Sequence, residues 1–184
     1  MSGQPFEVKV LSRETLKAPA FLAVNPTGAV PALVDGDFIL TQNSAILGYI
    51  ADTFPQAKLR GDGSARQRAE TTRWLALANT DMHPVFGTFF APSMLLPDVT
   101  QHDALQAAAR VRLRGLFERV NAQLEGKDWI AGFRSVADAY LYIMLRWAEM
   151  FQLDMSGLPH LAAFKQRMAT DSGVQAALKA EGLN

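Results

Sequence analysis

The sequence predicts a small α/β unit followed by a larger all-helical unit, and two observations carry this prediction. Near the N-terminus apolar and polar residues alternate, and an Asp-Gly pair separates two short apolar runs, which is typical of strands and a hairpin. From residue 64 onward apolar residues recur at three- and four-residue steps, the spacing of packed helices. We therefore expect an α/β unit over residues 1–54, a linker over 55–63 and a helical unit over 64–184.

The first unit opens with a predicted strand over residues 6–10, where apolar and charged residues alternate and indicate one half-buried face. A short helix is expected over residues 14–22. It should stop at Asn25-Pro26, because a residue that precedes proline avoids the helical conformation.

A β-hairpin and a capped helix are expected to complete this unit. The apolar runs 30–34 and 38–40 flank Asp35-Gly36, a pair typical of a tight turn between two strands. Thr41 can cap the helix predicted over residues 42–54, because its side-chain oxygen can accept a bond from a free N–H of the first turn.

The helical unit shows clear start signals. Ser135-Val136-Ala137-Asp138 is a capping box with Asp in the position usually held by Glu or Gln, and it opens an apolar helix that reaches Phe151. Pro159 suits the first turn of a further helix. The remaining helices are expected at about 64–90, at about 100–125, and from Asp171 to Gly182.

Composition excludes several classes of function. Lys plus Arg and Asp plus Glu both total 18, so there is no basic excess for nucleic acid binding. Cysteine is absent, which excludes disulfides, thiolate metal sites and a cysteine nucleophile, and the three histidines lack metal-ligand spacing. No apolar run approaches the ~18 residues of a membrane span, and the N-terminus lacks a secretory signal, so we expect a cytoplasmic protein without metal.

Four strings in family order resemble the cytosolic glutathione S-transferases, and most closely the bacterial beta class. They are residues 25–33 (NPTGAVPAL), 40–46 (LTQNSAI), 135–140 (SVADAY) and 174–183 (VQAALKAEGL). The resemblance implies a truncated thioredoxin-like domain followed by a helical-bundle domain, usually in a homodimer.

One unit of the family pattern is not matched. The family has a strand, a loop and a helix before the strand expected at 6–10, and that loop carries the Tyr, Ser or Cys that activates the glutathione sulfur. Without this central strand the unpaired backbone would cost on the order of 10 kcal/mol, so we expect strand 6–10 to pair elsewhere, to swap to another protomer or to come loose. The simpler alternative is a start codon upstream of Met1.

The resemblance assigns glutathione-binding roles near the hairpin. Val30-Pro31 matches a cis-proline step whose backbone pairs with the cysteinyl part of glutathione, although a trans proline at a sheet edge is the ordinary alternative. Gln42 and Asn43 match the pair at a helix start that holds the γ-glutamyl amine and carboxylate, whereas plain capping is the simpler interpretation.

The resemblance also implies roles in the helical unit. His83 matches a histidine near the glutathione sulfur, and it is the candidate catalytic residue, although most lone histidines are structural. Phe86, Phe89 and Trp147, together with Phe90, could line a pocket for a second substrate, whereas aromatic residues on helices are usually core.

Other polar residues have structural interpretations. Ser135 and Asp138 form the structural cap, and Arg134 stands where relatives have an apolar residue, which puts a hydrophobic staple in doubt. Arg110 and Arg114 belong to a helix face of mixed charge that we expect to be solvated.

The function expected from the resemblance is conjugation of the glutathione thiolate to a small hydrophobic electrophile. Glutathione is then a substrate, and no cofactor is expected. The alternative is a non-catalytic scaffold or binding protein with the same fold, inactive because the first βα unit is missing.

Overall fold

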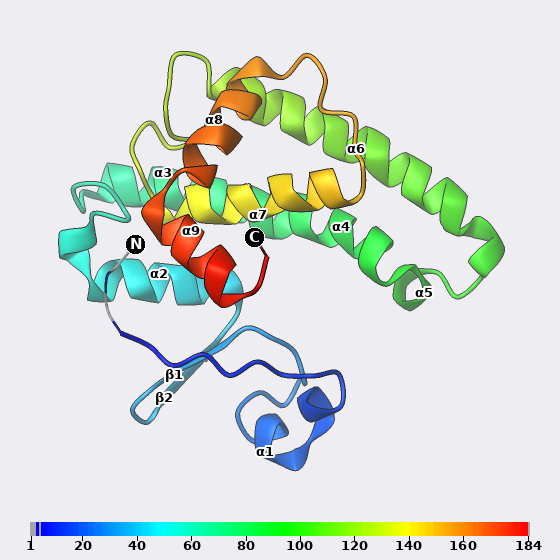
Figure 1. Cartoon of the computed structure of the whole chain (residues 1–184), viewed down its shortest axis with the longest axis horizontal. Coiled ribbons are helices and arrows are strands. Elements are labelled where there is room, and N and C mark those ends of the chain that lie inside the picture. The colour runs from blue at the N-terminus through cyan, green and yellow to red at the C-terminus, as the bar shows by residue number, and fades with distance from the viewer. Residues whose placement is uncertain (1–2, 4, 184) are drawn as a thin grey trace. The chain divides into compact units, whose positions relative to one another are not determined.

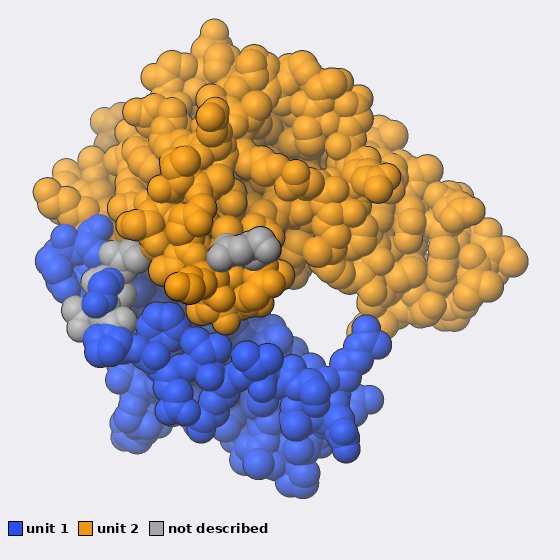
Figure 2. Space-filling view, in the orientation of Figure 1, with its two compact units in different colours: residues 1–57 blue, residues 58–184 orange. Residues whose placement is uncertain are grey.

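The computed structural model describes residue 3 and residues 5–183, which form two compact units. The first unit is Met1–Ala57 and the second is Lys58–Asn184, as Figure 2 shows in colour. The boundary falls inside the linker expected at residues 55–63. Pro55–Ala57 forms a 3-10 turn in the first unit, whereas Leu59 is buried in the second, so part of the expected linker is folded.

The first unit contains an antiparallel hairpin and one long helix (Figure 1). Strand β1 (Ala32–Asp35) pairs with β2 (Phe38–Thr41), so that Asp35 lies opposite Phe38 across a two-residue turn. Gly36 at this turn has a φ of 61°, which glycine adopts without a steric cost. Helix α2 (Asn43–Thr53) packs against both strands.

The expected strand at residues 6–10 is wrong for this structure. The segment has no strand partner among the described residues, and 83% of the Phe6 surface is exposed. Alternation alone does not make a strand, because an extended segment also needs a neighbouring edge for its backbone hydrogen bonds. Of the outcomes expected for this segment, pairing with another strand of the same chain is not seen among the described residues, and a swap to another protomer stays a prediction.

The expected helix at residues 14–22 is divided. A 3-10 turn (Thr15–Lys17) precedes α1 (Pro19–Leu22), and Ala18 between them is extended, with a ψ of 142°. Pro19 causes this break, because its ring disfavours the helical conformation in the preceding residue.

The second unit is helical, as predicted, but the helix expected at about 64–90 is interrupted. It consists of α3 (Ala65–Ala76), a π-helical turn (Leu77–Met82) and α4 (His83–Phe90). The short α5 (Pro92–Leu95) was not predicted. The other helices are α6 (His102–Gln123), α7 (Val136–Met150), α8 (Pro159–Ala169) and α9 (Ser172–Ala180).

Helix α7 is the central helix of this unit, and it contacts α3, α8 and the π-helical turn (Figure 1). Most of its residues are buried, in keeping with its apolar sequence. Helix α6 packs against α4 and α8. Completely buried core side chains include Phe86, Phe117, Phe164, Leu113 and Met144.

The start of α7 is fixed by the predicted capping box. The carboxylate of Asp138 accepts hydrogen bonds from the backbone N–H groups of Ser135 at 2.7 Å and Ile130 at 2.9 Å. Both Ser135 and Asp138 are completely buried. A further bond runs from the N–H of Val136 to the carbonyl oxygen of Leu59, which ties the beginning of the unit to α7.

Arg134 replaces the expected apolar contact with an ion pair. Its guanidinium pairs with the carboxylate of Asp171, the residue that caps α9. Asp171 also accepts from the N–H groups of Gly173 and Val174. The residue before the α7 cap therefore connects the starts of α7 and α9.

The arginines of α6 contribute more than a solvated face. Arg110 donates to the carbonyl oxygen of Phe151 at 2.8 Å, and Arg114 donates to those of Asp154 at 3.0 Å and Ser156 at 2.8 Å. These bonds fix the segment between α7 and α8. Within residue 3 and residues 5–183, no helix is both long and apolar enough to cross a bilayer.

The buried cap predicts a pH-dependent stability. Burial raises the pKa of Asp138 to about 6, although the surrounding N–H donors favour its charged form. In an unfolded chain this pKa is about 4. The group's contribution to the free energy of unfolding is therefore complete well below pH 4 and is lost, by about 3 kcal/mol in total, as the pH rises through about 6.

Urea unfolding between pH 4 and 7 measures this loss, which the wild type should show and Asp138→Asn should lack. Ser135→Ala, which keeps the carboxylate, serves as the control and should retain the slope. A difference between the wild type and Asp138→Asn that stays constant with pH contradicts the assignment.

Candidate functional site

The candidate site in the first unit begins with a loop held by Asn25. This buried side chain donates to the carbonyl oxygen of Ala29 at 2.6 Å and accepts from both the N–H and the hydroxyl group of Thr27. A short side chain that bonds the backbone two residues on is typical of an Asx turn. Asn25 therefore fixes the backbone just before Val30, a role that its Asn-Pro-Thr pattern could have indicated.

Val30 and Pro31 follow this loop, and the peptide bond between them is cis, as predicted. Val30 is well exposed, with 59% of its surface accessible, and β1 begins just after Pro31. An exposed backbone segment beside a strand can pair with an extended peptide-like ligand.

The start of α2 holds the other two residues predicted for this site. Gln42 rather than Thr41 is the residue before the helix, and it makes no side-chain cap, so the cap expected from Thr41 is wrong. Thr41 instead ends β2. The first backbone bond of the helix runs from the N–H of Ile46 to the carbonyl oxygen of Gln42, so the N–H groups of residues 43–45 precede it.

Gln42 has a strained backbone. Its φ of 72° and ψ of 113° belong to a region that residues with a Cβ rarely adopt. Strain of this kind costs about 1–3 kcal/mol and gathers at binding sites, where it aims a side chain or a free N–H at a ligand. The uncapped helix start can hold a carboxylate through its free N–H groups and its positive dipole end.

The candidate site in the second unit is centred on His83, the first residue of α4. Its Nδ1 lies 2.7 Å from the hydroxyl oxygen of Tyr140 on α7, and its ring meets the Trp147 ring edge-on at 4.8 Å. Burial lowers the pKa of His83, so its neutral form predominates near pH 7. A neutral imidazole has one nitrogen that can accept a proton.

Tyr140 extends this arrangement to the π-helical turn. Its hydroxyl group donates to Oδ1 of Asn79 at 3.2 Å. Asn79 and Tyr140 were not predicted as functional residues. No sequence signal relates them, because they are 61 positions apart and only the packing of α7 on the π-helical turn brings them together.

The aromatic residues expected to line a pocket form a connected cluster. Phe86 contacts Phe89, Trp147 and Phe151, and Phe90 contacts Trp147. Phe86 has an exposed fraction of 0% and is a core residue here, so its expected place in a pocket lining is revised. Phe89 and Trp147 are half-buried and keep a surface that a small apolar molecule could contact.

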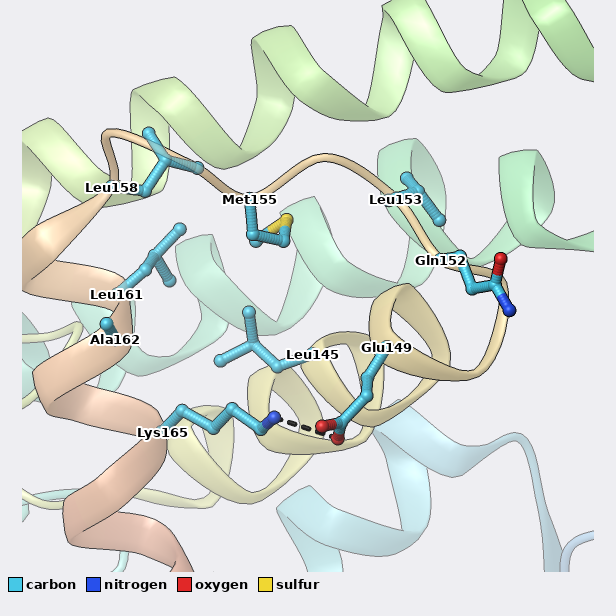
Figure 3. Close-up of a pocket in the computed structure, with 9 residues that line it drawn as sticks. All are labelled: Leu145, Glu149, Gln152, Leu153, Met155, Leu158, Leu161, Ala162 and Lys165. Atoms are coloured by element: carbon cyan, nitrogen blue, oxygen red, sulfur yellow. Dashed lines mark hydrogen bonds and ion pairs between the residues drawn. The ribbon is translucent and has the colours of Figure 1, made fainter.

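A separate pocket of about 390 Å³ lies among α7, α8 and the segment between them (Figure 3). Leucine side chains form much of its wall, and Lys165 and Glu149 form an ion pair of 2.8 Å beside it. None of its lining residues was predicted from the sequence. This pocket is not the candidate site, because neither His83 nor the start of α2 lines it.

The predicted site residues therefore form two groups. Val30-Pro31 and Gln42-Asn43 flank the end pair Ala32–Thr41 of the hairpin in the first unit, so the strand register places them at the same end of it. The structure brings together His83 and Trp147 within the second unit, and it adds Asn79 and Tyr140 to them.

Comparisons with known proteins show which family the chain resembles. Family models match over residues 1–52 (glutathione S-transferase, N-terminal domain) and residues 77–171 (glutathione S-transferase, C-terminal domain). The chain is 50% identical over 181 residues to glutathione S-transferase GST-4.5 of Xanthomonas campestris pv. campestris, covering 98% of this chain and 89% of that protein.

Two solved structures are similar over the whole chain. The glutathione S-transferase of Xylella fastidiosa has a TM-score of 0.95 at 49% identity, with 100% of this chain and 90% of that one covered. A sphingomonad glutathione S-transferase complexed with glutathione has a TM-score of 0.86 at 38% identity, with the same coverage.

The strain at Gln42 predicts a stabilising substitution. Gln42→Gly should raise the free energy of unfolding by about 1 kcal/mol, because glycine adopts the observed φ without a Cβ clash. Chemical denaturation measures the change. The control is Gln56→Gly at an exposed residue of the 3-10 turn, which should not stabilise the protein. An unchanged or lower stability of Gln42→Gly argues against strain at this position.

Proposed function

The chain belongs to the glutathione S-transferase family, and we propose that it conjugates glutathione to small hydrophobic electrophiles. In this reaction the glutathione thiolate attacks an electrophilic carbon, a C–S bond forms, and a leaving group such as chloride departs with the bonding electrons. The protein lowers the pKa of the thiol and orients the sulfur. The relatives reported above carry transferase names, and none supports the alternative of a non-catalytic scaffold.

Glutathione is proposed to bind in the first unit. The observation that carries this proposal is the start of α2, where three N–H groups precede the first helical bond and the side chain of Gln42 does not cap them. The γ-glutamyl carboxylate would accept hydrogen bonds from these N–H groups and from Asn43. The side chain of Gln42 would accept a hydrogen bond from the α-amino group. The backbone of Val30, well exposed, would pair with the cysteinyl part of the tripeptide.

The residues of the second unit are proposed to act on the sulfur and on the electrophile. His83 would accept the thiol proton, because its lowered pKa keeps the imidazole neutral near pH 7. Phe89 and Trp147 would contact the apolar body of the electrophile, since both keep accessible aromatic surface.

The remaining expectations stay proposals on the strength of the family. We propose a homodimer, a cytoplasmic location, and glutathione as a substrate with no further cofactor. The absence of cysteine from the chain supports chemistry in which the reactive sulfur comes from the substrate.

A conjugation assay with an aromatic chloride and glutathione tests the proposed function, alongside retention on immobilised glutathione. Turnover above the uncatalysed rate together with retention supports it. Retention without turnover supports the scaffold alternative, and neither retention nor turnover rejects glutathione as the ligand.

Removing the Gln42 side chain should weaken glutathione binding about tenfold, because one hydrogen bond to a charged group is lost. Gln42→Ala is suitable, since alanine keeps the Cβ and hence the backbone strain of the wild type. Calorimetry with glutathione measures the affinity, and Gln56→Ala is the matched control in the same unit. Equal affinities of Gln42→Ala and the wild type rule out a contact with the ligand.

Replacing His83 should raise the apparent thiol pKa of bound glutathione by about one unit, because the imidazolium that forms when His83 takes up the thiol proton stabilises the thiolate, and the variant lacks this charge. The thiolate absorbance of the complex as a function of pH measures this value. His160→Ala controls for the loss of a histidine elsewhere in the unit. An unchanged pKa in His83→Ala removes this residue from the mechanism.

A further inference from the structure

We propose that Asn79 and Tyr140 are positioning residues that hold the His83 imidazole in the tautomer with the proton on Nδ1, which leaves Nε2 as the proton acceptor. The catalytic role of His83 rests on the proposed function. The tautomer itself is a property of the protein alone.

The direction of the hydrogen bonds follows from how many protons the groups share. Tyr140 has one hydroxyl proton, and it is donated to Oδ1 of Asn79 at 3.2 Å. The same hydroxyl oxygen lies 2.7 Å from Nδ1 of His83, and it can then only accept at that contact. Nδ1 must therefore carry the proton, and the lone pair of the neutral ring is on Nε2.

The local backbone explains why these groups meet. Asn79 lies in the π-helical turn and His83 directly after it, so that two residues four positions apart approach the same side chain of α7. Single π turns of this kind frequently occur at functional sites. Tyr140 lies two residues beyond Asp138, whose bonds fix the start of α7 and hence the position of this hydroxyl group.

The arrangement suits a proton acceptor, because no hydrogen bond reverses when His83 is protonated. When a thiol S–H bond breaks and its proton moves to Nε2, the thiolate keeps the electron pair and the ring becomes an imidazolium. Nδ1 still donates to Tyr140, and Tyr140 still donates to Asn79. With the opposite tautomer Tyr140 would donate to Nδ1. Protonation of Nδ1 would then reverse that bond, and the hydroxyl proton would have to move to Oδ1 of Asn79.

Within residue 3 and residues 5–183, no ion pair competes for the ring. The ring contacts Tyr140 and Trp147, both on α7, and burial rather than a neighbouring charge lowers the pKa of His83. Asp81, the nearby acidic residue of the π-helical turn, accepts a hydrogen bond from Thr80. The hydroxyl group of Tyr140 is therefore the contact that selects the tautomer.

Imidazole ¹⁵N NMR of the whole chain, without any substrate, tests the proposal. In the wild type the His83 signals should report a protonated Nδ1 and an unprotonated Nε2. Asn79→Ala frees the Tyr140 proton for Nδ1, and Tyr140→Phe removes the acceptor, so both variants should move the ring to the Nε2–H tautomer. Asn79→Asp keeps an acceptor oxygen and should retain the wild-type tautomer.

Tyr142→Phe on the same helix is the matched control and should leave the His83 signals unchanged. The conjugation assay then links tautomer to rate. The kcat of Asn79→Ala should fall about tenfold or more, whereas KM for glutathione should stay within about twofold. The reason is that the variant impairs transfer of the thiol proton to His83 and not the binding of glutathione.

Three results overturn the proposal: a protonated Nε2 in the wild type, an unchanged tautomer in Asn79→Ala, or a changed tautomer with an unchanged kcat. If Tyr140→Phe does not fold, Asn79→Ala carries the test by itself. A wild type that lacks conjugating activity rejects the proposed function, whereas the NMR signals still decide whether Asn79 and Tyr140 set the tautomer.

Discussion

The buried carboxylate of Asp138 is the interaction on which much of the helical unit depends. It satisfies N–H groups that would otherwise be buried without a partner, and such groups cost about 1–3 kcal/mol each. In doing so it fixes the first turn of α7, the helix against which α3, α8 and the π-helical turn all pack. Tyr140 and Trp147, seven positions apart on this helix, thereby reach the same imidazole.

Local sequence was enough to predict the features that depend on neighbouring residues. The capping box at Ser135 and the hairpin around Gly36 each depend on a few adjacent residues, and both are present. The cis bond before Pro31, which the family resemblance implied, is present as well. The division into an α/β part and a helical part follows in the same way from the change in apolar spacing. For the candidate site, the sequence indicated His83 but not Tyr140 and Asn79, which form the hydrogen-bonded chain with it.

The features that sequence reasoning missed depend on tertiary contacts. The segment 6–10 alternates like a strand but has no edge to pair with, and the cap expected from Thr41 fails because that residue is used by β2. The carbonyl groups bound by Arg110 lie about forty positions away in the chain. The π-helical turn between α3 and α4 was likewise not predicted.

The π-helical turn also constrains how this chain can tolerate changes in length. Compared with an α-helical turn it accommodates one additional residue, and each residue of an α-helix accounts for a rotation of roughly 100° about the axis. A single-residue deletion in Leu77–Met82 could thus restore a continuous helix while swinging Asn79 around the axis relative to His83. A chain shortened by this residue would keep the helical architecture yet present a differently oriented histidine.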